Sequence, residues 1–534
     1  MSFVNEIGQR RTFAIISHPD AGKTTLTEKL LLYGGAIHLA GTVKARKSQK
    51  YAVSDWMEIE KQRGISVASS VLQFNYKGYK VNVLDTPGHQ DFSEDTYRTL
   101  TAADSAVMLI DAAKGVEGQT RKLFRVCRQR KIPVFTFINK LDRYGRNPFE
   151  LMDEIEKVLG IRSCPLNWPI GVNGRYCGIY DRQKNFADVF VHDGSHGAKQ
   201  IAAARYDPKD EAFREKVGEE AFSALCGDLE LLDVAGDPFA PEKIMAGELT
   251  PMFFGSAMTN FGVEVFLEEF LRLSPPPSPR PLKDGTRRDP DNPLFSAFIF
   301  KIQANMNPGH RDRIAFFRVC SGVFAKGMTV CHVQGGKNIR LSQPQQFLAQ
   351  EREIVDKAYP GDILGVFDPG IFAIGDTLCD ENENISFEDF PVFPPEQFAR
   401  VQPKETLKRK QFVKGIEQLG QEGAVQIFRQ PAAASDYYII GAVGALQMEV
   451  LAYRLRGEYG VELMITALSY SMARWLRGEE KYLSNMKGLD NGMLVLDKKG
   501  APVVLVNNAW NLNWLIERNP EITFLEAPNA LKDG

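Results

Sequence analysis

Residues 17–24 combine a glycine, a lysine and a threonine in a spacing suited to holding phosphate groups. The segment reads Ser-His-Pro-Asp-Ala-Gly-Lys-Thr and follows the apolar run 13–16. In such a loop backbone N–H groups surround phosphate oxygens, glycine allows close approach, lysine adds positive charge and threonine can ligate Mg²⁺. The usual pattern begins with glycine, whereas this one begins with serine. A chance match at a surface turn is therefore the alternative that other motifs must exclude.

A second polar segment, Asp-Thr-Pro-Gly-His at 85–89, follows the apolar run 81–84. Asp85 can hold Mg²⁺ through a water molecule, and the N–H of Gly88 can meet a terminal phosphate. Taken alone, the first four residues are also typical of a tight turn, and a lone histidine is most often a solvated surface residue. The place of His89 directly after a glycine that can sense phosphate favours a functional role.

A third segment, Asn-Lys-Leu-Asp at 139–142, follows the apolar run 134–138. The Asp142 carboxylate can accept hydrogen bonds from N1–H and the N2 amino group of guanine, and adenine lacks this donor pair. A buried carboxylate that the wrong base leaves half paired is costly, so Asp142 would select GTP over ATP. An isolated match is also compatible with a helix cap and two solvated charges. Three motifs in this order, each after an apolar run, instead predict a guanine-nucleotide site.

The predicted site consists of the phosphate loop, the turn at 85–89, the base-reading segment and Gly-Ser-Ala at 255–257, which can offer an N–H to the guanine carbonyl. The predicted GTP-binding residues are Ser17, His18, Pro19, Asp20, Ala21, Gly22, Lys23, Thr24, Thr25, Asp85, Thr86, Pro87, Gly88, His89, Asn139, Lys140, Leu141, Asp142, Gly255, Ser256 and Ala257. Lys23 and His89 are the predicted catalytic residues. Thr24 and, through water, Asp85 are predicted to hold Mg²⁺ beside GTP or GDP.

The elements that position these motifs alternate between short apolar strands and longer amphipathic segments from residue 11 to about 273. This pattern predicts a doubly wound, mostly parallel sheet with helices on both faces. Such a sheet gathers its ligand site at the carboxyl ends of the strands, where the three motifs lie. A helix at 25–32 is expected to present its positive dipole end to the phosphates.

The rest of the chain predicts further domains, so that the fold class is multidomain α/β. Residues 1–280 are assigned to the GTP-binding domain, with an inserted subdomain at about 143–250. The proline-rich segment 274–281 predicts a stiff linker. Alternating runs separated by glycine-containing turns predict an antiparallel β-barrel domain at 281–392.

Residues 393–534 form the predicted α+β third domain. Leu407, Val413, Ile416 and Leu419 lie near helical spacing, and a strand at 437–443 and a helix at 446–455 follow. No internal repeat is evident in the sequence.

Bulk composition fits a soluble globular protein of several domains. The chain has 534 residues, of which 25% are charged and 44% hydrophobic, and no apolar run approaches the roughly 18 residues of a membrane span. The N-terminus lacks the apolar core of a signal peptide. Seven scattered cysteines without metal-ligand spacing indicate reduced thiols in the cytoplasm. A net charge of −2 neither supports nor excludes an RNA partner.

Residues 11–142 resemble the GTP-binding domain of translational GTPases related to elongation factor G. The resemblance includes Asp-Trp-Met-Glu at 55–58 and Arg-Gly-Ile-Ser at 63–66. Lys-Ile-Gln-Ala-Asn-Met at 301–306 and His-Arg-Asp-Arg at 310–313 are most similar to the branch of this family that acts in translation termination. The resemblance implies a P-loop GTPase domain with an insertion, a β-barrel and a ferredoxin-like third domain.

The same resemblance implies residue roles. Ser66 would sense Mg²⁺ and the γ-phosphate from the first switch loop and so joins Thr24 and Asp85 as a metal ligand. His89 would position the attacking water when ribosomal RNA reorients it, with Pro19 and Ile65 as an apolar screen. The basic stretch at 44–50 is either solvated or in contact with ribosomal RNA.

The resemblance further implies a ribosome-stimulated GTPase in the cytoplasm that promotes the departure of class I release factors after peptide release. Its partners would be ribosomal RNA and proteins and, on the ribosome, those factors. It implies no DNA and no membrane partner, and a monomer is expected. Other ribosomal GTPases, either translocase-like or ribosome-protecting, are the nearest alternative, and the lack of room for a tRNA-moving arm argues against them. A nucleotide-gated scaffold without useful hydrolysis is the alternative from another class.

Overall fold

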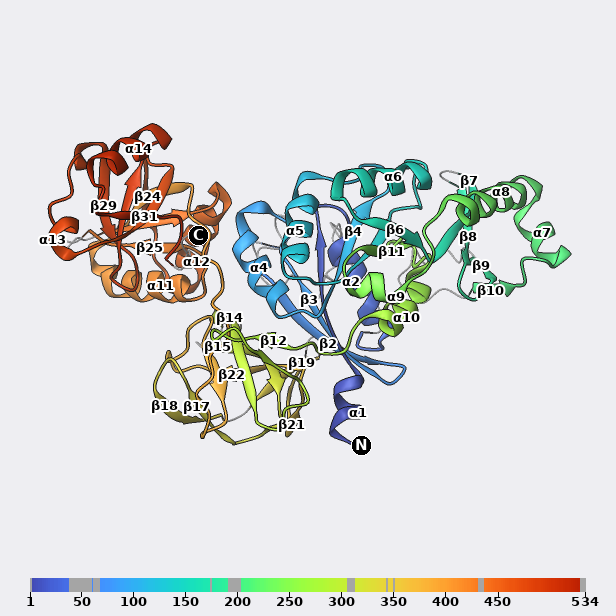
Figure 1. Cartoon of the computed structure of the whole chain (residues 1–534), viewed down its shortest axis with the longest axis horizontal. Coiled ribbons are helices and arrows are strands. Elements are labelled where there is room, and N and C mark those ends of the chain that lie inside the picture. Colours follow the sequence, from blue (N-terminus) through green and yellow to red (C-terminus); the bar gives the residue numbers. More distant parts are fainter. Residues whose placement is uncertain are drawn as a thin grey trace.

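The computed structural model in Figure 1 arranges the chain as an α/β body, a β-barrel and a C-terminal α+β body. It describes residues 2–37, 60, 68–172, 175–190, 203–304, 313–341, 344–348, 351–430 and 437–528. The motifs at 55–58 and 63–66, the basic stretch at 44–50 and the segment 305–312 lie outside these ranges. Within the described ranges, no helix has the length and apolar character needed to cross a membrane.

The first body contains a seven-stranded sheet in the order β2-β3-β1-β4-β5-β11-β6. All neighbouring pairs are parallel except β2 with β3. Its strands are β1 (Arg10–Ser17), β2 (Ser70–Tyr76), β3 (Tyr79–Asp85), β4 (Ser105–Asp111), β5 (Val134–Asn139), β6 (Arg162–Pro165) and β11 (Leu249–Phe254). The predicted mostly parallel sheet is confirmed.

Helices cover both faces of this sheet because alternate strand residues point to opposite sides. Phe13 and Ile15 pack with α2 (Lys23–Tyr33) and α10 (Val263–Leu273) on one face. Ala14 and Ile16 face the other side, which the second group of helices covers. That group comprises α4 (Ser93–Thr101), α5 (Gly118–Gln129) and α6 (Pro148–Leu159), and η1 (Gln90–Phe92) leads into α4. The short helix α1 (Phe3–Gly8) precedes β1.

The segment assigned to the insertion contains a separate antiparallel sheet in the order β10-β9-β8-β7. Its strands are β7 (Asn167–Val172), β8 (Arg175–Asp181), β9 (Phe186–Phe190) and β10 (Ala203–Tyr206), and its helices are α7 (Glu211–Val217), α8 (Glu219–Ala235) and α9 (Pro241–Met245). Strand β6 lies within residues 143–250 yet pairs with β11 in the main sheet. The separate sheet therefore begins later than the start of that segment.

The barrel is an eight-stranded antiparallel sheet in the order β18-β17-β23-β14-β15-β22-β19-β20. Its strands are β14 (Ser296–Ala304), β15 (Arg313–Ser321), β17 (Thr329–His332), β18 (Lys337–Arg340), β19 (Gln345–Leu348), β20 (Glu351–Ile354), β22 (Ile363–Phe367) and β23 (Thr377–Cys379). Two short pairs accompany it, namely β12 (Arg280–Pro281) with β13 (Arg287–Arg288) and β16 (Phe324–Ala325) with β21 (Lys357–Ala358). The expected antiparallel β-barrel is confirmed.

The C-terminal body contains two four-stranded units with the same order of strands and α-helices. The first runs β24 (Gln397–Pro403), η2 (Thr406–Lys408), α11 (Arg409–Gln421), β25 (Gln426–Phe428), β26 (Tyr438–Ala442), α12 (Ala445–Tyr459) and β27 (Leu463–Leu468). The second runs β28 (Met472–Arg477), α13 (Glu480–Leu483), η3 (Leu489–Asn491), β29 (Gly492–Leu496), β30 (Pro502–Val506), α14 (Ala509–Arg518) and β31 (Thr523–Leu525).

Each unit places its fourth strand beside its first and its third between first and second, which is the ferredoxin-like arrangement. The two sheets pack face to face through Phe398, Ile439 and Val503, while alternate residues such as Ile440 and Val504 face the helices. The ferredoxin-like fold is confirmed, and the body repeats it although the sequence shows no evident repeat. Leu407, which the sequence placed on a helical face, lies in η2 and is 95% exposed.

Candidate nucleotide-binding site

The phosphate loop connects the buried strand β1 to helix α2. Gly22 caps this helix with a φ of 99°, a conformation that side chains rarely adopt. A Cβ atom at this position would also overlap the side-chain amide of Asn139. Glycine is thus required here both by the backbone and by the base-reading segment that packs against it.

Two opposite charges meet beneath the loop. The Nζ atom of Lys23 lies 3.2 Å from Oδ1 of Asp85, and the two side chains are 7% and 2% exposed. Neither atom makes a hydrogen bond within the described structure, and the buried Oγ of Ser17 is also without a partner there. Buried polar atoms are normally hydrogen-bonded, so these three atoms suit a site that a phosphate group and a cation complete.

The base-reading segment is tied directly to the phosphate loop. The side-chain amide of Asn139 donates to the carbonyl of Ala21 at 2.8 Å, and Nζ of Lys140 donates to the carbonyl of Asp20. Lys140 also contacts Asp111 at 2.7 Å. Burial opposes the ionisation of Asp111, yet hydrogen bonds from Lys140 and the Ala113 N–H hold the pKa of this carboxyl below its usual value. Lys140 therefore links the phosphate loop to the end of β4.

The segment 255–257 supports the base-reading carboxylate. The hydroxyl of Ser256 donates to Oδ1 of Asp142, whose side chain is 19% exposed. The N–H of Ala257 donates to Oδ1 of Asn139 at 2.8 Å, and those of Gly255 and Ser256 donate to carbonyls at 2.9 and 2.8 Å. The structure thus brings 139–142 and 255–257 together, with the three N–H groups bonded inside the protein.

The turn at 85–89 lies beside the phosphate loop. The hydroxyl of Thr86 donates to the carbonyl of Ile15 at 2.7 Å, which fixes the turn to β1. A Cβ atom at Gly88 would lie 3.4 Å from Cα of Pro19. His89 follows with its side chain 35% exposed, and its Nδ1 accepts from the N–H of Asp91 at 3.3 Å. The imidazole therefore caps η1 while part of it remains accessible.

The structure describes some of the remaining predicted residues and not others. Thr24 and Thr25 begin α2 and are partly buried, and Leu141 is buried. Ser66 and Ile65 lie outside the described residues. His18 contacts Glu117 through Nε2 at 3.3 Å, a partner that sequence reasoning missed, as it missed Asp111. Asp111 could have been found because it directly follows the apolar run 106–110, whereas Glu117 carries no comparable signal.

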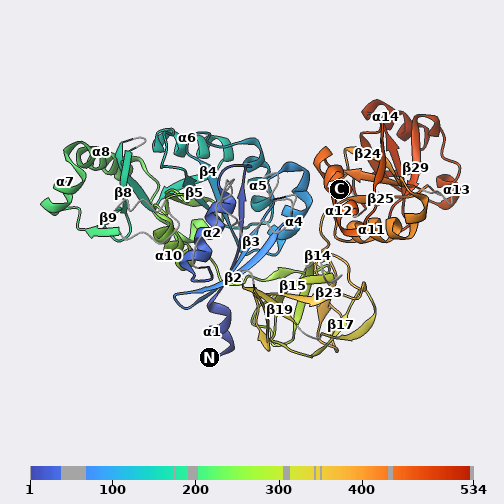
Figure 2. The ribbon, with the colours of Figure 1, turned by 180° about the vertical axis from the view of Figure 1, so that it is seen from behind.

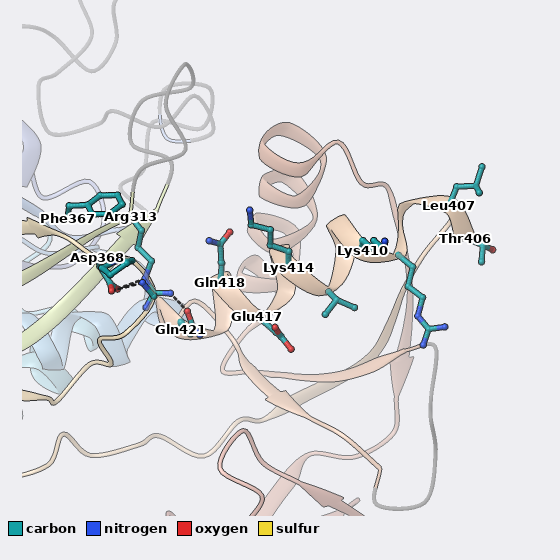
Figure 3. Close-up of a pocket in the computed structure, with 14 residues that line it drawn as sticks. Arg313, Phe367, Asp368, Thr406, Leu407, Lys410, Lys414, Glu417, Gln418 and Gln421 are labelled. Atoms are coloured by element: carbon teal, nitrogen blue, oxygen red, sulfur yellow. Dashed lines mark hydrogen bonds and ion pairs between the residues drawn. The ribbon is translucent and has the colours of Figure 1, made fainter. Parts of the chain in front are cut away.

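A pocket of about 1040 Å³ opens at a different place, between the barrel edge and α11. Figure 3 shows Arg313 bridging its two sides, with Nε 2.6 Å from Asp368 of the barrel and Nη1 donating to Gln421 of α11. Lys410 and Lys414 line the opposite wall. None of the predicted nucleotide-binding residues lines this pocket. The pocket instead lies at the interface between the barrel and the C-terminal body.

Three family models match successive parts of the chain. Residues 8–276 match the elongation factor Tu GTP binding domain, residues 294–381 match elongation factor G domain 2, and residues 387–516 match the class II release factor RF3 C-terminal domain. The first match covers the sheet that carries the phosphate loop. Guanine-nucleotide binding by this domain follows from the match.

Relatives at high identity span almost the whole chain. A peptide chain release factor 3 from Symbiobacterium thermophilum is 58% identical over 99% of both chains. Those from Gloeothece citriformis and Listeria monocytogenes are 53% and 52% identical and are covered over 95% and 98% of their length, with 97% of this chain aligned in each case.

A solved crystal structure from Thermus thermophilus shares the fold. Its TM-score is 0.69 at 22% sequence identity, over 88% of this chain and 71% of that one. At this identity the likeness concerns architecture alone. The full-length matches above 50% identity, together with the matched C-terminal domain, place the chain in the peptide chain release factor 3 family.

Proposed function

We propose that the residues at the strand ends bind GTP, and that the protein promotes the dissociation of class I release factors from the ribosome after peptide release, with GTP hydrolysis freeing the protein itself. As a member of its family, the chain is a ribosome-dependent GTPase of translation termination. The observation that carries the residue assignment is the direct contact between the phosphate loop and the base-reading segment, through Asn139 and Lys140.

In this proposal the phosphate loop and Lys23 hold the phosphates, and Asp142 reads the guanine. Ser256 supports this role because its hydroxyl fixes Oδ1 of the carboxylate, while Oδ2 lies 3.5 Å from Nε of Arg143. Since all three N–H groups at 255–257 are bonded within the protein, a contact from Ala257 to the base requires its bond to Asn139 to be exchanged or shared.

The donor set at Thr24 and Asp85 fits Mg²⁺, which prefers hydroxyl, carboxylate and water oxygens. Oδ1 of buried Asp85 supports this assignment because it makes no hydrogen bond in the described structure and contacts only the charge of Lys23. Ser66 is proposed as a further ligand by family resemblance. When bound, Mg²⁺ would supply charge neutralisation at the phosphates. The contribution of this chain is to hold the phosphates with Lys23 and the backbone of the loop.

His89 is proposed to orient the attacking water. Phosphoryl transfer to water needs little covalent chemistry from the protein, so positioning decides its rate. The partly exposed imidazole sits beside Gly88, and Pro19 approaches that glycine closely. We expect slow hydrolysis in the free protein and fast hydrolysis once the ribosome reorients the ring.

We further propose that the protein acts as a monomer in the cytoplasm, with ribosomal RNA, ribosomal proteins and class I release factors as its partners. The cysteines that the structure describes are all free thiols, which supports a reducing compartment.

The decisive experiment measures the departure of a fluorescently labelled class I release factor from terminated ribosomes after this protein and GTP are added. Accelerated departure that fails with a non-hydrolysable GTP analogue at multiple turnover supports the proposal. Unchanged departure together with brisk ribosome-stimulated hydrolysis would assign the GTPase to another step of translation, the second candidate function.

His89→Ala tests the catalytic assignment in the same system. The variant is expected to bind GTP with unchanged affinity but to lose ribosome-stimulated turnover, because the ring contacts neither Lys23 nor the base-reading segment in the described structure. Undiminished turnover would refute the role of His89.

A further inference from the structure

The short helix η1, directly after His89, contacts the C-terminal body. Asp91 lies in η1 and its side chain is 7% exposed. Its Oδ2 atom accepts a hydrogen bond of 2.8 Å from the backbone N–H of Leu446, at the start of α12. These two residues are 355 positions apart, so the bond joins the GTPase domain to the C-terminal body.

Asp91 supplies the cap that α12 lacks. The N-cap residue of α12 is Gly444, which has no side chain to accept from the first N–H groups of the helix. A carboxylate is the preferred acceptor at this place because it satisfies an N–H group and faces the positive end of the helix dipole. Gly444 is also the residue that lets the carboxylate approach, since a Cβ atom there would overlap all three atoms of the Asp91 carboxylate.

The same aspartate lies against the imidazole of His89, because its backbone N–H donates to Nδ1 and its carboxylate is adjacent to that nitrogen. Nδ1 of His89 lies 3.3 Å from the backbone N of Asp91 and 3.3 Å from its Oδ1. One carboxylate oxygen therefore faces His89 while the other caps α12. Ring and helix are linked through a single buried side chain.

Neighbouring contacts hold the two bodies in register around this link. Arg98 of α4 donates to the carbonyl of Gly423 at 3.2 Å. Within the C-terminal body, Gln447 of α12 donates to the carbonyl of Ala424 at 3.1 Å, which ties α12 to the segment that Arg98 contacts. In both views of the molecule α4 lies beside α12 (Figures 1 and 2). The contact is thus part of a continuous interface in which η1 and α4 meet the start of α12.

We propose that Asp91 is a positioning residue for His89, and that the docking of α12 sets the orientation of the imidazole through it. This inference rests on the proposed role of His89 in hydrolysis. When α12 is docked, the carboxylate is fixed between the helix and the ring. When the C-terminal body moves away, the carboxylate loses Leu446 and the ring loses a fixed neighbour. Movement of the C-terminal body on the ribosome would thereby alter the rate of GTP hydrolysis without touching the nucleotide.

Gly444→Ala is the sharpest test because it leaves Asp91 and His89 intact. The backbone at Gly444 is extended, with φ −151° and ψ 170°, so alanine is tolerated there and only the approach of the carboxylate is blocked. Gly457→Ala is the matched control, since it lies in the same helix and its added Cβ would meet nothing within 4 Å. Asp91→Ala removes the link entirely, and Asp91→Asn keeps a neutral acceptor for Leu446.

Three quantities are measured on the full chain: kcat and the KM for ribosomes in GTP hydrolysis, the affinity for a fluorescent GTP analogue, and hydrogen–deuterium exchange of the peptide that begins α12. We expect Gly444→Ala and Asp91→Ala to lower kcat by about 5- to 30-fold, the factor that corresponds to one lost helix cap. Exchange at the start of α12 should accelerate, nucleotide affinity should stay unchanged, and Asp91→Asn should retain more activity than Asp91→Ala. Because each single change removes the same link, the double variant should be no slower than the slower single one.

The inference is overturned if Gly444→Ala has the same kcat as Gly457→Ala. It is equally overturned if kcat is unchanged and only the KM for ribosomes rises, or if nucleotide affinity falls in parallel with kcat. His89→Ala separates this inference from the proposed function. An inactive His89→Ala beside a fully active Gly444→Ala refutes the link alone, whereas a fully active His89→Ala refutes the catalytic assignment on which the link rests.

Discussion

Replacing Asp104 by alanine should separate the GTPase domain from the barrel. Its carboxylate lies between two arginines, with Arg318 of the barrel at 2.6 Å and Arg280 of the linker at 2.7 Å. The N–H and hydroxyl of Ser278 donate to the same carboxylate at 3.0 Å. Burial and the neighbouring Arg318 lower the pKa of Arg280 to about 10, and the negative charge of Asp104 opposes this effect.

The magnitude follows from what the change leaves behind. Removing one partner of a buried ion pair costs about 3–5 kcal/mol, because the remaining charge is uncompensated. Two arginines lose their carboxylate here, but each keeps backbone carbonyls as acceptors: Arg280 those of Thr101 and Ala103, and Arg318 that of Ala102. We therefore expect a loss of about 3–5 kcal/mol in total rather than twice that amount.

The assay is thermal and urea-induced unfolding, analysed without assuming a single transition because the protein has several domains. The variant should show an earlier transition for the barrel, separated from that of the GTPase domain. Asp153→Ala is the matched control, since Asp153 pairs with Lys157 at 2.7 Å with side chains 59% and 74% exposed. An exposed pair of this kind contributes less than about 1 kcal/mol. If Asp104→Ala shifts the unfolding curve no more than Asp153→Ala, the reasoning on the buried pair is wrong.

Three further predictions concern specificity, thiols and pH. Asp142→Asn should shift base preference from guanine toward xanthine by about two orders of magnitude or more, because two charge-assisted hydrogen bonds change. The shift is measured by competition between GTP and xanthosine triphosphate. A variant that still selects GTP would exclude Asp142 as the base reader. A thiol reagent at pH 8 should label exposed Cys226 first and Cys127 only on unfolding, since burial raises the pKa of Cys127 to about 12; equal labelling rates would contradict this. Burial, opposed by Arg98, raises the pKa of Glu94 above 4.5. Its stabilising contribution is therefore complete below the unfolded-state pKa and is lost as the pH rises through the folded-state value. As the pH rises above 4.5, Glu94→Gln should lose less unfolding free energy than the wild type in urea titrations, and equal losses would refute this prediction.

The sequence predicted which segments form the site better than it predicted which residues these segments contact. The runs before residues 17, 85 and 139 favoured strands because they are short and mostly apolar, and parallel strands bring their ends to one edge. The contact between Asn139 and Ala21 follows from that topology. The residue roles stay predictions, because the geometry shows where residues lie but not which function they perform. The domain boundaries at 280 and 392 also stay predictions.

The local sequence pattern did not predict the contacts between domains. Periodicity reports that a side chain is buried, but not which distant residue it meets. Asp91 and Leu446 illustrate this, as neither residue type nor spacing links them. Leu407 shows the reverse error, since its spacing matched a helical face although the residue lies in the preceding turn and is exposed. The repeated ferredoxin-like unit escaped notice because topology can recur without an evident sequence repeat.

Buried polar bonds contribute to the contacts between domains, in addition to apolar packing. Inside each domain the cores are apolar and continuous. Between domains the described structure uses buried polar links such as Asp91 with Leu446, Asp104 with Arg318, and Arg313 with Gln421. A buried polar group is costly when its partner is removed but costs little when water replaces that partner on separation. Opening the interface between the GTPase domain and the barrel would also expose apolar surface, because Leu100 and Ala103 share one buried cluster with Phe298 and Phe316 of the barrel. In the link proposed above, the bond between Asp91 and Leu446 is directional, so that a movement of the C-terminal body reaches His89 through this one residue.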